Sequence, residues 1–354
     1  MRIAFTADNH LLQFQDSPDR YHALRNILQT CGNQEVDKLV IAGDLFDKTL
    51  ANYSDFENLV RTHRPDQTKI AILPGNHDPD LSDKHLAAQG VKVYSDPIFL
   101  PLEDQWWILL IPYQKNTSMG QLIASFAPDF EDKRWILVSH GDYTQSVRQQ
   151  NPAEPGTYFP LTRGDLQRYN PAHAFLGHIH RPHSADSVIY PGSPCPLNRT
   201  ETGLRRFLIF DTSTNQVSSI KINNSEIFFQ ENFLLIPGKN QEKVLRNEID
   251  QRIQSWSLPP GWEQKTQPYI QVLGYAQNRS KIIEIITNAF SDFLFSSDTH
   301  LDLSQLYHRP DPDRDYIAAE FQTWLNSQDW LTDSNEITRQ DVLFEALKII
   351  YGAY

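Results

Sequence analysis

Five short apolar segments of the sequence each end beside side chains that bind cations: carboxylates, an asparagine amide and imidazoles. The segments are residues 3–7, 39–42, 70–73, 135–139 and 172–176, and the side chains after them are Asp8 and His10, Asp44, Asn76 and His77, His140, and His178 and His180. Apolar runs of this length predict buried β-strands. Because the carboxyl ends of parallel strands meet at one edge of a sheet, we expect these side chains to gather at one site.

Oxygen and imidazole ligands in this mixture suit a site for two divalent cations that share one carboxylate. Asp44 is the expected shared ligand, since it follows Gly43 directly at the tip of its strand. Two neighbouring cations acidify the water between them, and the resulting hydroxide can attack phosphorus while the metals hold the phosphate oxygens. The chemistry that this pattern predicts is therefore hydrolysis of a phosphoester without a protein nucleophile.

The composition narrows the class of protein. The chain has 354 residues, of which 40% are hydrophobic and 21% are charged, and its only cysteines are Cys31 and Cys195. Two cysteines are too few for a disulfide framework or a thiolate metal site. No apolar run approaches the roughly 20 residues of a membrane helix, and the N-terminus leads straight into a strand, so a cytoplasmic protein that does not bind membranes is expected.

The formal net charge of −12 disfavours binding of nucleic acid by bulk electrostatics from this chain alone. It does not exclude nucleic acid as a substrate. Two bound divalent cations would add positive charge at the site itself, and a partner subunit could supply a basic surface.

The order of expected elements divides the chain into three parts. Residues 1–222 alternate apolar strands with helical stretches such as 19–30 and 54–62, which is typical of an α/β layered domain. Residues 223–308 follow a strand, helix, strand, helix order (227–236, 241–256, 269–275 and 281–295), which predicts a small α+β unit. Prolines at 310 and 312 precede two amphipathic helices, 315–330 and 339–351, in the segment 309–354. A long loop is expected at residues 144–160.

Five motifs in chain order resemble those of the calcineurin-like metallophosphoesterases. They are Asp8-Asn9-His10, Gly43-Asp44, Gly75-Asn76-His77-Asp78, His140 and Gly177-His178-Ile179-His180. Finer details are similar to the SbcD/Mre11-type nucleases, namely residues 43–47, 175–182 and Tyr190-Pro191-Gly192-Ser193-Pro194. The resemblance covers residues 8–194. It implies a layered metallophosphoesterase β-sandwich flanked by helices, a small capping domain and a C-terminal helical tail.

The resemblance also implies roles for individual residues. One metal would be held by Asp8, His10, Asp44 and His180, and the other by Asp44, Asn76, His140 and His178. Mn²⁺ fits this ligand set and the habit of the family, although Fe, Zn and Mg accept the same ligand types.

Two further residues have roles implied by the resemblance. His77 would face the phosphate and stabilise developing charge or protonate the leaving oxygen. Asp47 would orient His77 or a water. Alternatively, Asp47 is a carboxylate at a helix N-terminus.

By this resemblance we expect a metal-dependent DNA exonuclease, with endonuclease activity left open. It would be the catalytic subunit of a complex with an SbcC/Rad50-like ATPase. The helices of residues 309–354 would dock onto that ATPase; in the alternative, they fold back onto the chain's own cap or core. The alternative is a stand-alone phosphodiesterase for a nucleotide or another small diester. Protein phosphatases of the superfamily are disfavoured, since Asp47-Lys48-Thr49 and Asp78 depart from their motifs. A homodimer is left open.

Overall fold

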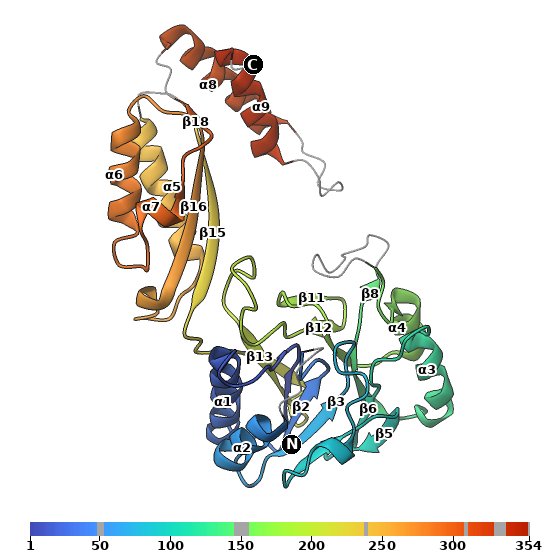
Figure 1. Cartoon of the computed structure of the whole chain (residues 1–354). Helices are drawn as coiled ribbons and strands as arrows, with labels where there is room; N and C mark the ends of the chain where they lie inside the picture. Colours follow the sequence, from blue (N-terminus) through green and yellow to red (C-terminus); the bar gives the residue numbers. More distant parts are fainter. Residues whose placement is uncertain (48–52, 145–155, 237–239, 308–310, 329–337, 353–354) are drawn as a thin grey trace. The chain divides into compact units, whose positions relative to one another are not determined.

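The computed structural model describes residues 1–47, 53–144, 156–236, 240–307, 311–328 and 338–352. They form two compact units, Met1–Ser225 and Glu226–Tyr354, drawn in Figure 1. Most of the loop expected at residues 144–160 lies outside the described residues. No helix in the described part of the chain is long and apolar enough to cross a membrane.

The first unit contains a mixed sheet with the strand order β14-β13-β1-β2-β3-β4. Strands β1 to β4 run parallel to one another, while β13 pairs antiparallel with both β1 and β14. The bounds are β1 (Arg2–Thr6), β2 (Lys38–Ala42), β3 (Lys69–Leu73), β4 (Val91–Val93), β13 (Arg206–Asp211) and β14 (Gln216–Lys221).

A second sheet in the same unit has the order β11-β12-β10-β7-β6-β5. Its inner strands β12, β10, β7 and β6 are parallel, and both edge strands are antiparallel to their neighbours. The bounds are β5 (Ile98–Pro101), β6 (Trp106–Leu110), β7 (Arg134–His140), β10 (His173–Gly177), β11 (His183–Ala185) and β12 (Val188–Tyr190); a small pair, β8 (Tyr143–Thr144) and β9 (Leu161–Thr162), lies apart from it.

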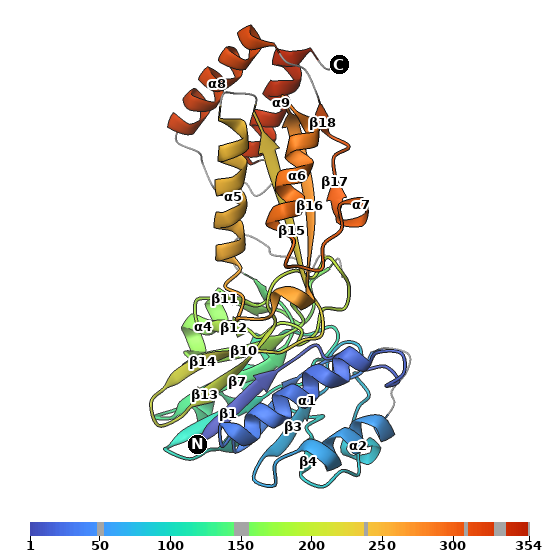
Figure 2. The same ribbon diagram turned by 90° about the vertical axis from the view of Figure 1, so that its left-hand side faces the viewer.

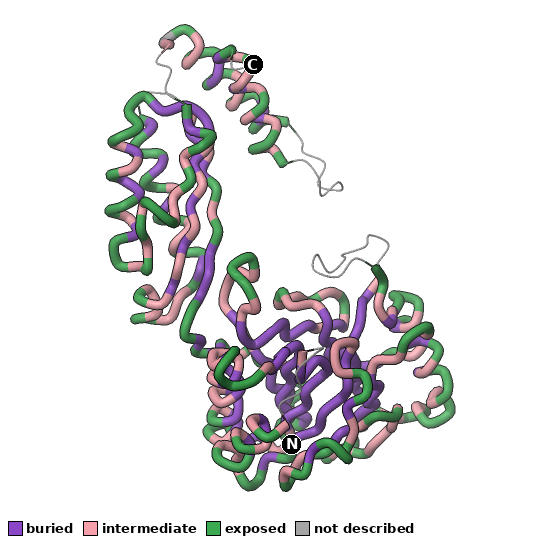
Figure 3. Tube along the Cα trace, viewed as in Figure 1, coloured by how far each residue is buried: buried purple, intermediate pink, exposed green. Residues whose placement is uncertain are grey.

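The two sheets pack face to face and helices cover their outer faces. Phe5 of β1 stacks on Phe175 of β10 with ring centroids 3.9 Å apart, and these residues belong to one buried cluster between the sheets. Helices α1 (Pro18–Asn33) and α2 (Tyr53–His63) pack on the first sheet, and α3 (Met119–Phe126) and α4 (Arg163–Tyr169) on the second. Figure 3 shows that the central strands are buried. The layered β-sandwich flanked by helices is thereby confirmed.

The second unit is built on a small parallel sheet. Strand β16 pairs in parallel with β15, β17 and β18, and Figure 2 shows α5 and α6 lying along β15 and β16. The bounds are β15 (Ile227–Leu235), α5 (Gln241–Ser255), β16 (Thr266–Tyr275), α6 (Arg279–Ala289), α7 (Ser297–His300), β17 (Leu301–Asp302) and β18 (Leu306–Tyr307).

Helix α6 ends at Ala289, so the helix expected over residues 281–295 was too long at its C-terminal end. Three of the next six residues are phenylalanines, and the segment is not helical. Phe290 and Phe293 contact the ring of Trp256, and the amide of Leu294 donates to the carbonyl of Thr266. Packing against a neighbouring strand therefore overrides the helical pattern of the sequence here.

Two C-terminal helices, α8 (Pro312–Ser327) and α9 (Arg339–Tyr351), complete the second unit. They bury one apolar face, which includes Leu325 and Leu347, and the ring of Tyr351 stacks on Tyr275 of β16 at 4.1 Å. Other large side chains on these helices are exposed: Tyr316, Ile317, Trp324 and Ile349. The helices thus have both a face that packs onto their own unit and a face open to solvent.

Candidate metal centre

The loops that follow the central strands adopt backbone conformations that non-glycine residues rarely take. Asp8, His10, Asp44 and His178 all have positive φ angles, of 54°, 46°, 51° and 95°. Conformations of this kind cost on the order of 1–3 kcal/mol each and persist where the surroundings enforce them. Here the amide of Asp8 donates to Gly43 O (3.1 Å) and that of His10 to Asp44 O (2.9 Å). The first two loops therefore hold each other in place.

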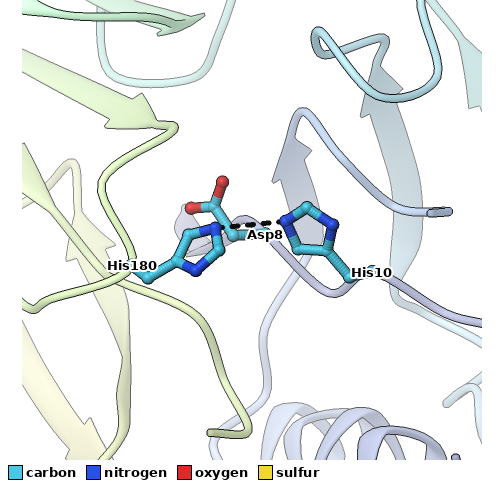
Figure 4. Close-up of side chains that lie close together, drawn as sticks. All are labelled: Asp8, His10 and His180. Atoms are coloured by element: carbon cyan, nitrogen blue, oxygen red, sulfur yellow. Dashed lines mark hydrogen bonds between the residues drawn. The ribbon is translucent and has the colours of Figure 1, made fainter. Parts of the chain in front are cut away.

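A first group of side chains consists of Asp8, His10 and His180. Nε2 of His10 lies 3.2 Å from Nε2 of His180, and Figure 4 shows the carboxylate of Asp8 beside both rings. Two ligands of one cation with bonds of about 2.1 Å at right angles would lie about 3 Å apart. Oδ1 of Asp8 accepts from the amide of His178, whereas its buried Oδ2 has no hydrogen-bond partner among the described residues. These atoms fit a cation.

A second group surrounds Asn76. Its Oδ1 lies 2.8 Å from Nε2 of His140 and 3.2 Å from Nδ1 of His178. Oδ2 of Asp44 lies 3.2 Å from the same nitrogen of His140 and 3.7 Å from Nε2 of His10. Asp44 is therefore positioned between the two groups, as a shared ligand must be, and the buried cluster fits a binuclear metal site.

The two buried carboxylates of the cluster, Asp8 and Asp44, favour positive charge beside them. Burial raises the pKa of Asp8 to about 6. Burial also acts to raise the pKa of Asp44, but His140 and its hydrogen bond more than offset that effect and hold the pKa below its usual value. Burial acts to lower the pKa of His140, but the charge and hydrogen bond of Asp44, with smaller contributions from Asp8 and the Ala42 carbonyl, raise the pKa to about 10. The carboxylates thus attract a proton to the place where a cation would supply the same charge.

Two glycines permit the close approach of these groups. A Cβ built on Gly43, whose φ is +90°, would lie 2.0 Å from Nδ1 of His140, and one on Gly75 would lie 2.1 Å from Oδ1 of Asp44. Non-bonded atoms cannot approach each other this closely. Glycine is therefore required at both positions if Asp44 and His140 are to meet.

His77 and Asp47 lie beside the cluster. Nδ1 of His77 is 3.5 Å from Oδ1 of Asp47, and Arg20 Nη1 is 3.8 Å from the other oxygen of Asp47. The His77 side chain is 18% exposed, while those of His10 and Asp44 are 2% exposed. His77 packs edge-on against His10 and lies close enough to His10 and Asp44 to join a metal group. The predicted residues are thus brought together, with His77 nearer the solvent.

Several supporting residues were not assigned from the sequence. Oε1 of Glu201 lies 2.7 Å from Nδ1 of His180. Asp78 accepts from the amides of Gly75 and Phe46, and Oδ1 of Asp142 lies 3.7 Å from Nε2 of His178. Asp78 and Asp142 stand close to ligands in the sequence and could have been suspected from that position. Glu201 carries no local signal.

The pairing of Glu201 with His180 is visible in their ionisation. Burial acts to raise the pKa of Glu201, but the hydrogen bond and charge of His180, together with Arg205 and the amide of Leu197, outweigh burial and lower the pKa to about 2. Burial also acts to lower the pKa of His180, but the same hydrogen bond and the charges of Asp8, Glu201 and Asp44 together raise the pKa above its usual value. Each partner therefore stabilises the charged form of the other.

Comparison with known proteins yields one family and several distant relatives. The profile of the calcineurin-like phosphoesterases matches residues 1–184. The chain is 24% identical over 269 residues to the SbcD subunit of the nuclease SbcCD from Rhodobacter capsulatus, covering 57% of this chain and 64% of that protein. It is 25% identical over 227 residues to "Uncharacterized metallophosphoesterase YhaO" of Bacillus subtilis, covering 56% of this chain and 51% of that one.

The chain thus spans less than two thirds of the length of either curated relative. Among solved structures, the purple acid phosphatase of yellow lupin (Lupinus luteus) superposes with a TM-score of 0.37 at 15% identity, over 62% of this chain and 52% of that one.

Proposed function

Since this chain belongs to the calcineurin-like phosphoesterase family, we propose that it hydrolyses phosphodiester bonds of DNA with two bound divalent cations. The observation that carries the proposal is that Asp44, His140 and Asn76 meet at strand ends from two different sheets. Nε2 of His140 lies 3.2 Å from Oδ2 of Asp44 and 2.8 Å from Oδ1 of Asn76. A structural core has no use for carboxylate, amide and imidazole groups gathered this closely, whereas a metal centre requires them.

Each cation has a ligand set in this proposal. Asp8, His10, Asp44 and His180 would hold one, and Asp44, Asn76, His140 and His178 the other. Mn²⁺ is the proposed metal, because the set mixes oxygen and imidazole ligands without sulfur. When bound, the two cations supply a Lewis acid for the phosphate oxygens and lower the pKa of water.

The protein's own groups orient and protonate the substrate. Nδ1 of His77 faces Asp47, and Arg20 holds the opposite oxygen of that carboxylate. In this proposal Nε2 of His77 is the nitrogen that reaches a phosphate oxygen. We assign to His77 the transfer of a proton to the leaving oxygen, and to Asp47 the orientation of the His77 ring.

DNA is the proposed substrate for two reasons. The sequence details at residues 43–47, 175–182 and 190–194 resemble SbcD-type nucleases, and a distant relative is named as part of the nuclease SbcCD. In addition, the second unit adds a sheet and helices that a small diester would not require. The net charge of −12 means that much of the positive surface for DNA must come from the cations and from a partner.

The proposed partner is an SbcC-like ATPase. Helices α8 and α9 leave Tyr316, Ile317, Trp324 and Ile349 in solvent. Exposed apolar surface of this kind supports the proposal of a protein interface. The same helices and their flanks carry nine acidic residues between Asp311 and Glu345, against the basic residues Arg314, Arg339 and Lys348. A basic partner surface would complement them.

A cleavage assay tests the proposed substrate. End-labelled single-stranded and double-stranded DNA, and bis(p-nitrophenyl) phosphate as a small diester, are incubated with the protein and Mn²⁺, Mg²⁺ or EDTA. Cleavage of DNA with Mn²⁺ and none in EDTA is expected. Hydrolysis of the small diester without DNA cleavage, even with the ATPase added, would favour the stand-alone phosphodiesterase instead.

A further inference from the structure

The imidazole ring of His180 is held through its Nδ1 by a carboxylate. Its Nδ1 lies 2.7 Å from Oε1 of Glu201, while its Nε2 faces Nε2 of His10 at 3.2 Å. An ionised carboxylate can only accept a hydrogen bond, so Nδ1 must be the nitrogen that carries the proton. The lone pair of Nε2 is consequently directed into the group formed by Asp8, His10 and His180.

Glu201 is itself held by several donors. Its Oε2 accepts from Ser193 Oγ at 3.0 Å and from the amide of Leu197 at 3.1 Å. The guanidinium of Arg205 lies 3.5 Å from the same oxygen and donates to the carbonyl of His180 at 2.8 Å. Arg205 is only 3% exposed. A buried arginine thus ties the backbone and the side-chain partner of His180 to one another.

The turn at residues 190–194 supports the same histidine. The amide of Ser193 donates to the carbonyl of His180 at 3.0 Å. Gly192 has a φ of +80°, and a Cβ on it would lie 2.6 Å from that carbonyl oxygen. This turn, whose sequence resembles one in the SbcD/Mre11-type nucleases, packs directly against the backbone of His180.

The other histidines of the cluster have different supports. Nδ1 of His140 lies 2.9 Å from the backbone carbonyl of Ala42, a neutral acceptor. Nε2 of His178 lies 3.7 Å from the carboxylate of Asp142, which is 1 Å farther than Nδ1 of His180 lies from Glu201. The carboxylate support is therefore strongest on the side of the cluster that contains Asp8, His10 and His180.

We propose that Glu201 is a positioning residue that holds His180 and selectively strengthens cation binding at the site formed by Asp8, His10, Asp44 and His180. The proposal rests on the two-cation centre of the proposed function. A carboxylate bonded to the far nitrogen of a ligand histidine fixes the ring and makes it a better donor, and its loss commonly weakens metal binding by about 10- to 100-fold.

The experiment measures the affinity of each site for Mn²⁺. Equilibrium dialysis and isothermal titration with Mn²⁺ alone are applied to the full chain and to its Glu201→Gln and Glu201→Ala variants. We expect the unaltered protein to bind two Mn²⁺. In Glu201→Gln one of them should bind about 10- to 100-fold more weakly while the other keeps its affinity, and Glu201→Ala should lose more.

Two additional measurements separate positioning from a general structural effect. Glu57→Gln is the matched control, because Glu57 on α2 also accepts a hydrogen bond from a backbone amide, that of Ala87, outside the cluster. This variant should leave both Mn²⁺ affinities unchanged. The visible absorption of bound Co²⁺ reports the ligand geometry, and we expect it to change in Glu201→Gln at one site. If Glu201→Ala fails to fold by circular dichroism, Glu201→Gln decides.

The possible outcomes separate the role of Glu201 from the metal centre on which it depends. Unchanged affinities in Glu201→Gln, or an equal loss at both sites, would overturn the role of Glu201 while leaving the two-cation centre intact. Failure of the unaltered protein to bind Mn²⁺ at all would instead overturn the proposed function, and the role of Glu201 with it.

Discussion

Oδ2 of Asp44 lies 3.2 Å from Nε2 of His140, although Asp44 follows β2 of the first sheet and His140 ends β7 of the second. Nδ1 of His140 lies 2.9 Å from the carbonyl oxygen of Ala42, the last residue of β2. The candidate metal centre is therefore also a joint between the two sheets. Changes at this joint should alter stability and activity together.

The first prediction concerns the glycine that allows this contact. Gly43→Ala would drive a methyl group into the His140 ring, so we expect it to abolish most phosphodiesterase activity and to lower the free energy of unfolding by about 2 kcal/mol or more. Urea unfolding and hydrolysis of bis(p-nitrophenyl) phosphate measure the two effects.

Gly203→Ala is the control for this substitution, because Gly203 has the same φ of +90° but no neighbouring atom within 4 Å of a built Cβ. It should show only the backbone cost, on the order of 1 kcal/mol. If the two variants unfold at the same urea concentration and are equally active, then steric contact with His140 is not what requires glycine at position 43.

The second prediction concerns two proposed ligands from different strands. Asp8→Ala and His178→Ala should each abolish cleavage of DNA with Mn²⁺ and reduce the bound metal, because each removes a group that holds a cation. His22→Ala on α1, a histidine 40% exposed in its side chain, should behave as the unaltered protein. Metal content is measured after dialysis. Full activity of both ligand variants in metal-replete buffer would refute the two-metal assignment.

The third prediction separates His77 from the ligands. If His77 acts on the leaving oxygen, His77→Asn should lower turnover by roughly 100-fold or more while bound metal stays near normal. The contrary result is informative, since His77 lies close enough to His10 and Asp44 to bind a cation. Loss of both cations in the variant would move His77 into the ligand set.

The ligands could be predicted from the sequence because each follows an apolar strand within a local motif. Asp44 after residues 39–42 and His140 after residues 135–139 are examples, and the structure places both at strand ends. Glu201 could not be found in this way. It lies 21 positions beyond His180 in the chain, and only the folded backbone brings the two together. The same holds for Arg20, which meets Asp47 from α1.

Fold predictions failed where packing outweighed local pattern. Residues 290–295 continue the apolar spacing of α6, yet their aromatic rings gather around Trp256 and end the helix at Ala289. Short strands such as β11 and β12 were not expected, because three residues are too few to show a periodic signal.

The last prediction concerns the C-terminal helices and the proposed ATPase partner. Deletion of residues 310–354 would expose Tyr275, which stacks on Tyr351, so loss of binding after truncation could result from damage to the second unit. Single substitutions on the two faces avoid this difficulty. Leu347 is fully buried and Trp324 is 54% exposed, and the two lie on neighbouring helices of the same unit.

Leu347→Ala should lower the free energy of unfolding by about 2–5 kcal/mol, the usual cost of emptying a buried site. Trp324→Ala should leave unfolding within about 0.5 kcal/mol of the unaltered protein but weaken binding of the cognate SbcC-like ATPase by about 10-fold or more, since exposed tryptophans are frequent interface hot spots. Asn326→Ala, an exposed polar change on the same helix, should alter neither quantity. Urea unfolding and a pull-down titration measure them. Undiminished ATPase binding by Trp324→Ala would count against docking through this face, and it would leave α8 and α9 with only their packing role in the second unit.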